Sequence, residues 1–176
     1  MNSYGRNFFN LPAMTQMWVD GAKEEIDSEI TFFDMRETNE ARYVMSNEIS
    51  FIKILTVSAL QICRSRLTSK LHVRFSEGPS FSAVSLVFKC DCKTGVEGEF
   101  CFADCAPYFE FLPEAVDFVV QTAKESDIKI KTYKNGDNVY LDFIFGKQSE
   151  ASQIIGLNSI SGEVFRYSFL SSLEMF

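Results

Sequence analysis

The chain has 176 residues, a hydrophobic content of 46% and a net charge of −7 at neutral pH. This length and apolar content suit one domain with a sizeable core. The acidic balance argues against general nucleic-acid affinity through bulk charge. No apolar stretch reaches the ~20 residues that a membrane-spanning helix needs, and Met1–Asn10 lacks the pattern of a secretory signal. We therefore expect no membrane partner.

The first 28 residues are predicted to form an N-terminal arm with a short helix. Within Ala13–Ile26, apolar residues recur at helical spacing. The apolar side chains of this arm either anchor a protein partner or cover one open face of a sheet. The candidate partner-binding residues are Phe8, Phe9, Leu11, Met14 and Trp18.

Residues 29–176 are predicted to form a single α+β domain that starts with a strand at Glu29–Met35. A helix is expected over Val44–Cys63, where a wide apolar stripe recurs. Alternation then predicts a strand at Leu71–Phe75, and a more uniformly apolar strand follows at Phe81–Cys90. The turn Glu77-Gly78-Pro79-Ser80 joins the two strands.

The second half of the chain continues with a third strand at Phe100–Phe102 and a helix that starts at Pro113, because proline suits the first helical turn. Asn135-Gly136 is a strong hairpin signal. A two-residue turn there predicts that Lys134 lies opposite Asp137, which puts apolar pairs on one face of the hairpin. Val164–Leu170 alternates and is predicted to be the last strand.

An apolar helix followed by two alternating strands thus occurs twice, over Ser46–Cys90 and Tyr108–Phe145. Such a repeat predicts an antiparallel sheet built from two helix-plus-hairpin units, with the two main helices on one face.

The duplicated order resembles one domain of the DNA sliding clamps, the family of proliferating cell nuclear antigen and the checkpoint clamp subunits. The likeness lies in HVRFSEGPSFSAVS, in SDIKIKTYKNGDNVYLDFIFG and in GEVFRYSFLSSLE. It implies a non-enzymatic interaction subunit in DNA replication or DNA-damage signalling, which joins other protein subunits in a homo- or hetero-oligomer. The nucleic-acid-facing residues would then be Lys53, Arg64, Arg66 and Lys70.

The second predicted helix departs from the clamp pattern. It offers Glu114, Asp117 and Glu125 against Lys124 alone, and acidic residues repel phosphates. DNA contact is therefore expected only indirectly or weakly. The alternative is an acidic secretion chaperone or adaptor that binds an extended partner segment, because class I type III secretion chaperones share much of the element order.

The chain has five cysteines and one histidine, His72. An odd cysteine number without a secretory signal favours an intracellular location, nuclear or cytoplasmic. His72 lies in an alternating run, which favours a solvated or core-edge side chain. No acid–base constellation can be assembled, so we expect no enzymatic activity and no cofactor.

The alternative to a protein without a cofactor is one in which the cysteines bind zinc. If the turn after Cys90 centres on Gly95-Val96, Cys90 lies opposite Cys101, and four thiolates come within reach of one metal ion. The spacing is not a usual C-x2-C pattern, and buried cysteines also behave as small apolar residues. The candidate zinc ligands are Cys90, Cys92, Cys101 and Cys105.

Overall fold

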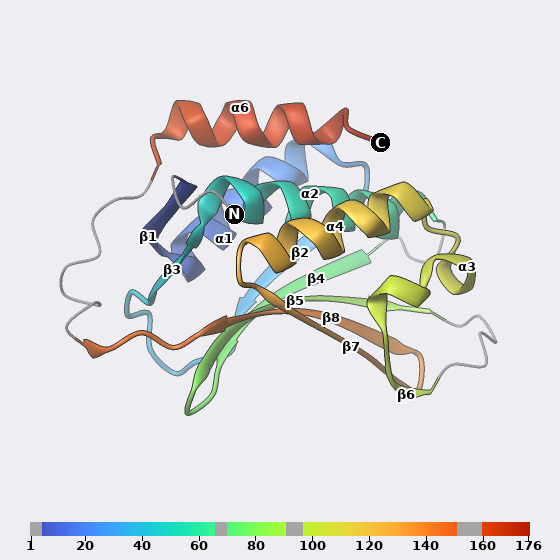
Figure 1. The fold of residues 1–176 in the computed structure, drawn as a ribbon, viewed down its shortest axis with the longest axis horizontal. Coiled ribbons are helices and arrows are strands. Elements are labelled where there is room, and N and C mark those ends of the chain that lie inside the picture. The colour runs from blue at the N-terminus through green and yellow to red at the C-terminus, as the bar shows by residue number, and fades with distance from the viewer. Residues whose placement is uncertain (1–4, 66–69, 91–96, 151–159) are drawn as a thin grey trace.

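The computed structural model describes residues 5–65, 70–90, 97–150 and 160–176 (Figure 1). Its main sheet has six strands in the order β2-β4-β5-β8-β7-β6, and a separate two-stranded sheet pairs β1 with β3. The strands are β1 (Arg6–Asn10), β2 (Glu29–Asp34), β3 (Tyr43–Asn47), β4 (Lys70–Glu77), β5 (Phe81–Lys89), β6 (Gly98–Phe100), β7 (Lys129–Asn135) and β8 (Asn138–Gly146). The helices are α1 (Leu11–Glu25), α2 (Glu48–Arg64), η2 (Phe102–Asp104), α3 (Ala106–Phe109), α4 (Pro113–Glu125) and α6 (Gly162–Leu173).

The four long helices α1, α2, α4 and α6 lie on one side of the main sheet, with α6 outermost (Figure 1). In the part of the chain that the structure describes, no helix covers the opposite face. The core lies between the helices and the sheet. Phe51 of α2 is at its centre, where its ring packs against Phe143 and Phe145 of β8 at centroid distances of 6.0 and 5.0 Å.

Helix α2 starts at Glu48, four residues later than the predicted start at Val44, because Tyr43–Asn47 forms strand β3 instead. The Asn47 side chain caps the helix by accepting a hydrogen bond from the Ser50 N–H. Glu48 is fully buried, and one of its carboxylate oxygens accepts hydrogen bonds from the Asn7 side chain and the Ile160 N–H. This carboxylate therefore ties β1 and the segment before α6 to the start of α2.

Residues 5–26, which were predicted to be an arm, pack into the same core as the rest of the domain. β1 pairs antiparallel with β3, and α1 lies against the core with Trp18 fully buried. The Trp18 ring packs edge-on against Phe169 of α6, and its Nε1–H donates to the Thr56 hydroxyl at 2.9 Å.

The buried Trp18–Thr56 hydrogen bond yields a stability prediction. Thr56→Val keeps the side-chain shape but leaves the Trp18 N–H without an acceptor, which should cost about 1–3 kcal/mol in the free energy of unfolding. Thr15→Val is the matched control, because Thr15 is equally buried but its hydroxyl bonds only the Leu11 carbonyl of its own helix. Chemical denaturation measures both changes. Equal losses in the two variants would contradict the role given to Thr56.

The two predicted hairpins are confirmed. β4 and β5 pair around the turn at Gly78, and β7 and β8 pair around Gly136. The register of the second hairpin was predicted wrongly: Lys134 lies opposite Val139, two residues further along β8 than predicted. The loop is Gly136-Asp137, and Gly136 has φ +61°, so the glycine takes the first central position of the turn rather than the second. A shift of two residues leaves the faces of both strands unchanged, which is why the alternation could not detect it.

The α+β class is confirmed, but the predicted antiparallel sheet is in fact mixed, because β2 pairs parallel to β4. Neither this pair nor the four helices on one face belongs to the predicted clamp-like repeat. The third predicted strand lies two residues earlier than expected: β6 covers Gly98–Phe100, and Phe102 already belongs to the 3-10 helix η2.

The predicted last strand is wrong, because Val164–Leu170 lies within helix α6. The Ser161 side chain caps this helix by accepting from the Val164 N–H at 3.3 Å. The buried residues of α6 recur at helical spacing, while Tyr167, which the strand pattern turns inward, is 76% exposed. They are Phe165, Ser168, Phe169 and Ser172. Among the described residues, no helix combines the length and the apolar character needed to cross a membrane.

Asp142 lies on the sheet face away from the helices, opposite Lys131 in the strand register. Burial raises the pKa of its carboxyl group, although Ser85 and Lys131 act in the opposite direction. A raised pKa in the folded state means that the charged form is disfavoured there. The resulting loss of stability is absent below the unfolded pKa and complete above the folded pKa.

Asp142→Asn should therefore raise the melting temperature at pH 7 and change it little near pH 3, where the carboxyl group is protonated in both states. Asp117→Asn, at an exposed position on α4, is the control and should show no such pH dependence. Thermal melts at both pH values measure the difference. A stabilisation that is the same at both values would show that the carboxylate charge is not its cause.

Candidate functional site

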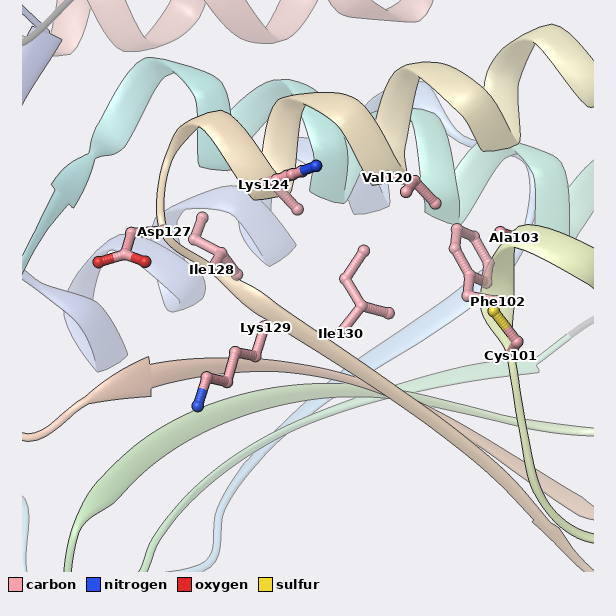
Figure 2. Close-up of a pocket in the computed structure, with 10 residues that line it drawn as sticks. Cys101, Phe102, Ala103, Val120, Lys124, Asp127, Ile128, Lys129 and Ile130 are labelled. Carbon is pink, nitrogen blue, oxygen red and sulfur yellow. The ribbon is translucent and has the colours of Figure 1, made fainter. Parts of the chain in front are cut away.

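A pocket of about 340 Å³ lies between helix α4, the start of β7 and η2 (Figure 2), and we call it the α4–β7 pocket. Its described lining is Cys101, Phe102, Ala103, Val120, Ala123, Lys124, Asp127, Ile128, Lys129 and Ile130. Most of the exposed lining is apolar. A volume of this size suits a small organic ligand.

The turn after α4 builds one end of this pocket. Asp127 has φ +60°, the left-handed conformation, which reverses the chain into β7. The Ile128 N–H donates to the Ala123 carbonyl at 2.9 Å, and the Asp127 N–H donates to the Lys124 carbonyl at 3.3 Å. These two bonds are the Schellman arrangement, which brings the residue after the turn back under the helix. Ile128 is accordingly buried and closes the pocket beneath α4.

The pocket has an apolar end and a charged end. Figure 2 shows Val120 and Ile130 with Phe102 around one end, while Lys124 lies on α4 toward the other end, where the side chains of Asp127 and Lys129 point outward. Lys124 is exposed, so its amine can meet a ligand without prior desolvation. This arrangement suits a ligand with a flat apolar ring at one end and anionic groups at the other.

The first turn of α4 is poorly suited to hold an anion. Its N-cap residue Leu112 donates its N–H to the Gln61 side chain at 2.8 Å, and Pro113 has no N–H to offer. Glu114 adds a negative charge to the same turn. A phosphate group near α4 would therefore rely on the Lys124 amine near the other end of the helix rather than on backbone N–H groups.

The space between the sheet and α3 is filled by aromatic side chains. The cavity there has a volume of only about 10 Å³, about the space of one water molecule. Phe109 packs against the rings of Phe88, Phe100 and Phe111. No organic ligand enters this space without displacing a ring.

A third pocket, of about 320 Å³, lies at the start of α1 and is lined by Asn10, Gln16, Asp34, Arg36 and Glu40 among others. The guanidinium group of Arg36 already has partners within this chain, since it pairs with Asp34 at 2.9 Å and with Glu77 at 3.7 Å. The pKa of Asp34 is lowered despite its burial, because Arg36 bonds and pairs with the carboxylate. The α4–β7 pocket, whose Lys124 amine is exposed, is the better candidate for an anionic ligand.

Two of the predicted nucleic-acid-facing residues already have partners within this chain. Lys53 lies on α2 and is half-buried. Arg64 donates to the backbone carbonyl oxygen of Phe176 at 2.6 Å, and Lys70 lies 3.8 Å from Glu29. Arg66 is outside the described residues.

Most of the predicted partner-binding residues are core residues of this chain. Phe9, Leu11, Met14 and Trp18 are buried, and Phe8 is half-buried on β1. Their burial fits the alternative in which the N-terminal residues cover the sheet.

The predicted zinc ligands do not meet as expected. Cys90 follows β5, whose neighbours are β4 and β8, whereas Cys101 follows β6, whose neighbour is β7. Cys101 is exposed, and burial raises the pKa of the Cys105 thiol to about 12. Cys92 is outside the described residues, which contain no group of three or more metal-ligating side chains.

Neither a protein-family model nor a curated protein matches this sequence. Several solved structures, in contrast, match the fold of this chain. The catalytic domain of histidine kinase ThkA matches with a TM-score of 0.60 and 16% identity, over 82% of this chain and 99% of that one. The fold is that of a histidine kinase catalytic domain. The ATP binding domain of PrrB from Mycobacterium tuberculosis also matches, with a TM-score of 0.60 and 7% identity over 82% of this chain and 98% of that one.

ThkA in complex with the response regulator protein TrrA gives a third match, with a TM-score of 0.60 and 13% identity. It covers 81% of this chain and 42% of the longer kinase chain. At such identities, the likeness to histidine kinase catalytic domains establishes the fold alone.

These matches correct the predictions that came from the repeat. The resemblance to sliding clamps is wrong, and with it the expected role in DNA replication or damage signalling. The chaperone alternative is wrong for the same reason. The expectation of a non-enzymatic protein is overturned as well, because this fold is one that kinase catalytic domains adopt.

Apart from Cys101, a predicted zinc ligand, the residues that line the α4–β7 pocket were absent from the sequence-based site predictions. Lys124 was noted only as the one cation set against the acids of the second predicted helix. The available signal was the apolar stripe of α4 followed by Ser126-Asp127. It was missed because glycine, the usual residue of a left-handed helix end, is absent there.

Proposed function

We propose that this domain binds an adenine nucleotide with Mg²⁺ and acts as the ATP-binding part of a signalling kinase of the histidine kinase type. The observation that carries the proposal is the fold match, which extends over 98% or more of two solved domains of that class. One of these two domains is described as ATP-binding. Because ATP is an intracellular substrate, we also propose that the domain works inside the cell.

We assign the nucleotide to the α4–β7 pocket. The base would lie against Val120, Phe102 and Ile130, and the phosphates would meet the Lys124 amine. Mg²⁺ is usually bound through one or two carboxylates together with substrate phosphates. The Asp127 carboxylate, at the same end of the pocket as Lys124, is the oxygen ligand that the described lining offers.

The phosphoryl acceptor would come from another protein or from a segment outside this chain. The single histidine, His72, lies on β4, and its ring Nδ1 is hydrogen-bonded to the Thr31 hydroxyl at 2.7 Å. It is on the sheet face opposite the helices, whereas the α4–β7 pocket is on the helical side. A protein partner therefore belongs to the proposal, and the solved complex of ThkA with TrrA is a precedent for one.

The proposed site predicts a weak nucleotide complex. The Lys124 amine is exposed and the first turn of α4 is closed to phosphates, so the phosphates gain few buried hydrogen bonds. We expect a dissociation constant of about 0.1–1 mM for ATP with Mg²⁺.

The test is a titration of the isotopically labelled protein with ATP and Mg²⁺, followed by NMR. Shifts of the backbone amides of residues 120–130 that saturate in this range support both the function and the pocket. Saturable shifts confined to other residues support nucleotide binding and overturn the pocket. No shift at about 5 mM ATP, well above the expected constant, would overturn the proposed function.

A further inference from the structure

The main sheet has one face without a helix in the described part of the chain, and we call it the open face (Figure 1). The strand register determines which side chains lie there, because residues alternate with those facing the core. Arg74, Ser85, Asp142 and Lys131 occupy one straight line across four neighbouring strands. The neighbouring line across the same four strands consists of His72, Val87, Tyr140 and Tyr133.

Two tyrosines hold the cations of the open face in place. The rings of Tyr133 and Tyr140 stack at a centroid distance of 4.5 Å with an interplanar angle of 7°. The Arg74 guanidinium lies over the Tyr140 ring, and the Lys131 amine lies over the Tyr133 ring, each 5.9 Å from the centroid. Since the cations are positioned before any partner arrives, less side-chain freedom is lost when a partner binds.

The open face is more positive than the chain as a whole, whose net charge is −7. Arg74 and Lys131 are accompanied by Lys89 and Lys129 at the ends of their strands. The acids on this face are Asp142, Glu99 at the β6 edge, and Glu29, which lies beside Lys70. This excess of cations on one face of an acidic protein is complementary to an anionic partner.

One acceptor on the open face has no partner among the described residues. The Oδ1 atom of Asp142 is buried without a hydrogen bond, midway along the line from Arg74 to Lys131. A buried acceptor without a partner costs stability, which a donor from a bound molecule restores once the Asp142 carboxylate rotates toward the open face. A partner that fits this line therefore carries a hydrogen-bond donor between two anionic groups.

We propose that the open face binds an extended, acidic protein segment with the pattern Glu-x-Thr-x-Glu. Arg74 and Lys131 are three strand spacings of about 4.8 Å apart, or about 14 Å. An extended chain advances about 3.3 Å per residue, so glutamates four residues apart are separated by about 13 Å and reach both cations. The central threonine then faces the region between Ser85 and Asp142 and offers its hydroxyl as the missing donor.

A protein segment fits better than a single-stranded nucleic acid. Single strands gain much of their affinity by stacking bases on free aromatic faces. Here Tyr140 is covered by Tyr133 on one side and by Arg74 on the other, and Lys131 lies over Tyr133. The two tyrosine rings and the two cations over them thus offer fixed charges rather than free aromatic faces on which bases could stack.

The test uses fluorescence anisotropy with a short labelled peptide that contains Glu-Val-Thr-Val-Glu. A peptide with glutamine in place of both glutamates and a peptide with valine in place of threonine are the matched probes. We expect the Glu peptide to bind more tightly than either probe, and the variant Arg74→Gln/Lys131→Gln to weaken its binding at least about tenfold. Lys23→Gln, on the exposed side of α1, should leave binding unchanged.

Circular dichroism and thermal melts establish that each variant is folded before its binding is compared. Equal binding of the Glu and Gln peptides, or no binding of either, would overturn the proposal. So would binding of a thymidine oligonucleotide or of phosphatidylserine vesicles that depends on Arg74 and Lys131 while the Glu peptide fails to bind.

Discussion

Phe51→Ala is expected to destabilise the domain by about 3–5 kcal/mol, the usual cost of removing a fully buried aromatic ring. Phe51 is completely buried and packs against three rings from two other parts of the chain: Phe9 at 6.5 Å, Phe143 at 6.0 Å and Phe145 at 5.0 Å. Domains of this kind are stable by only about 5–15 kcal/mol. The variant should therefore melt roughly 10 °C or more below the parent protein.

Tyr167→Ala is the control for Phe51→Ala, because it also removes a ring, but one that is 76% exposed on α6. Its effect should stay within about 0.5 kcal/mol. Thermal and urea denaturation measure both variants. A Phe51→Ala protein that melts within a few degrees of the parent would show that these rings do not form the centre of the core.

The second prediction concerns the nucleotide. Lys124→Gln should weaken ATP binding by about tenfold, because the Lys124 amine is expected to form a charge-assisted hydrogen bond with a phosphate group. Adenosine, which has no phosphates, should bind both proteins equally. This difference separates loss of a phosphate contact from damage to the apolar end of the pocket.

Lys23→Gln makes the same change in charge at an exposed position away from the pocket. It controls for the general effect of removing positive charge from an acidic protein. If both variants weaken ATP binding equally, Lys124 does not contact the phosphates. If Lys124→Gln leaves the affinity intact, the nucleotide lies elsewhere.

Local signals predicted local structure well. Gly78-Pro79 and Asn135-Gly136 identified both hairpins, and the apolar stripe after Val44 identified most of α2. Each of these depends on residues close together in the chain, where turn chemistry and periodicity act directly.

The failures concern alternatives that a periodic pattern does not separate. Phe165, Tyr167 and Phe169 alternate as in a strand, but Phe165 and Phe169 also lie one helical turn apart, and packing against Trp18 favours the helix. The parallel pairing of β2 with β4 depends on how α2 returns the chain to the sheet, which no local motif specifies. Without it, a sheet of two hairpins could be mistaken for a clamp-like repeat.

The α4–β7 pocket could not be predicted from the sequence for a related reason. Lys124 and Lys129 are five positions apart on two different elements, and the left-handed turn at Asp127 sets their relative positions. Aspartate adopts this conformation less readily than glycine, so the turn carried no clear signature. The sequence alone therefore did not show that the two residues line one pocket.

The antiparallel pair at the middle of the sheet has a consequence during protein synthesis. β5 ends at Lys89, but its inner neighbour β8 ends only at Gly146. At a translation rate of about 5–20 residues per second, one edge of β5 lacks its hydrogen-bonding neighbour for roughly 3–11 s on the ribosome. Because an unpaired apolar strand is prone to aggregation, the yield of folded protein should depend on how well this nascent edge is shielded.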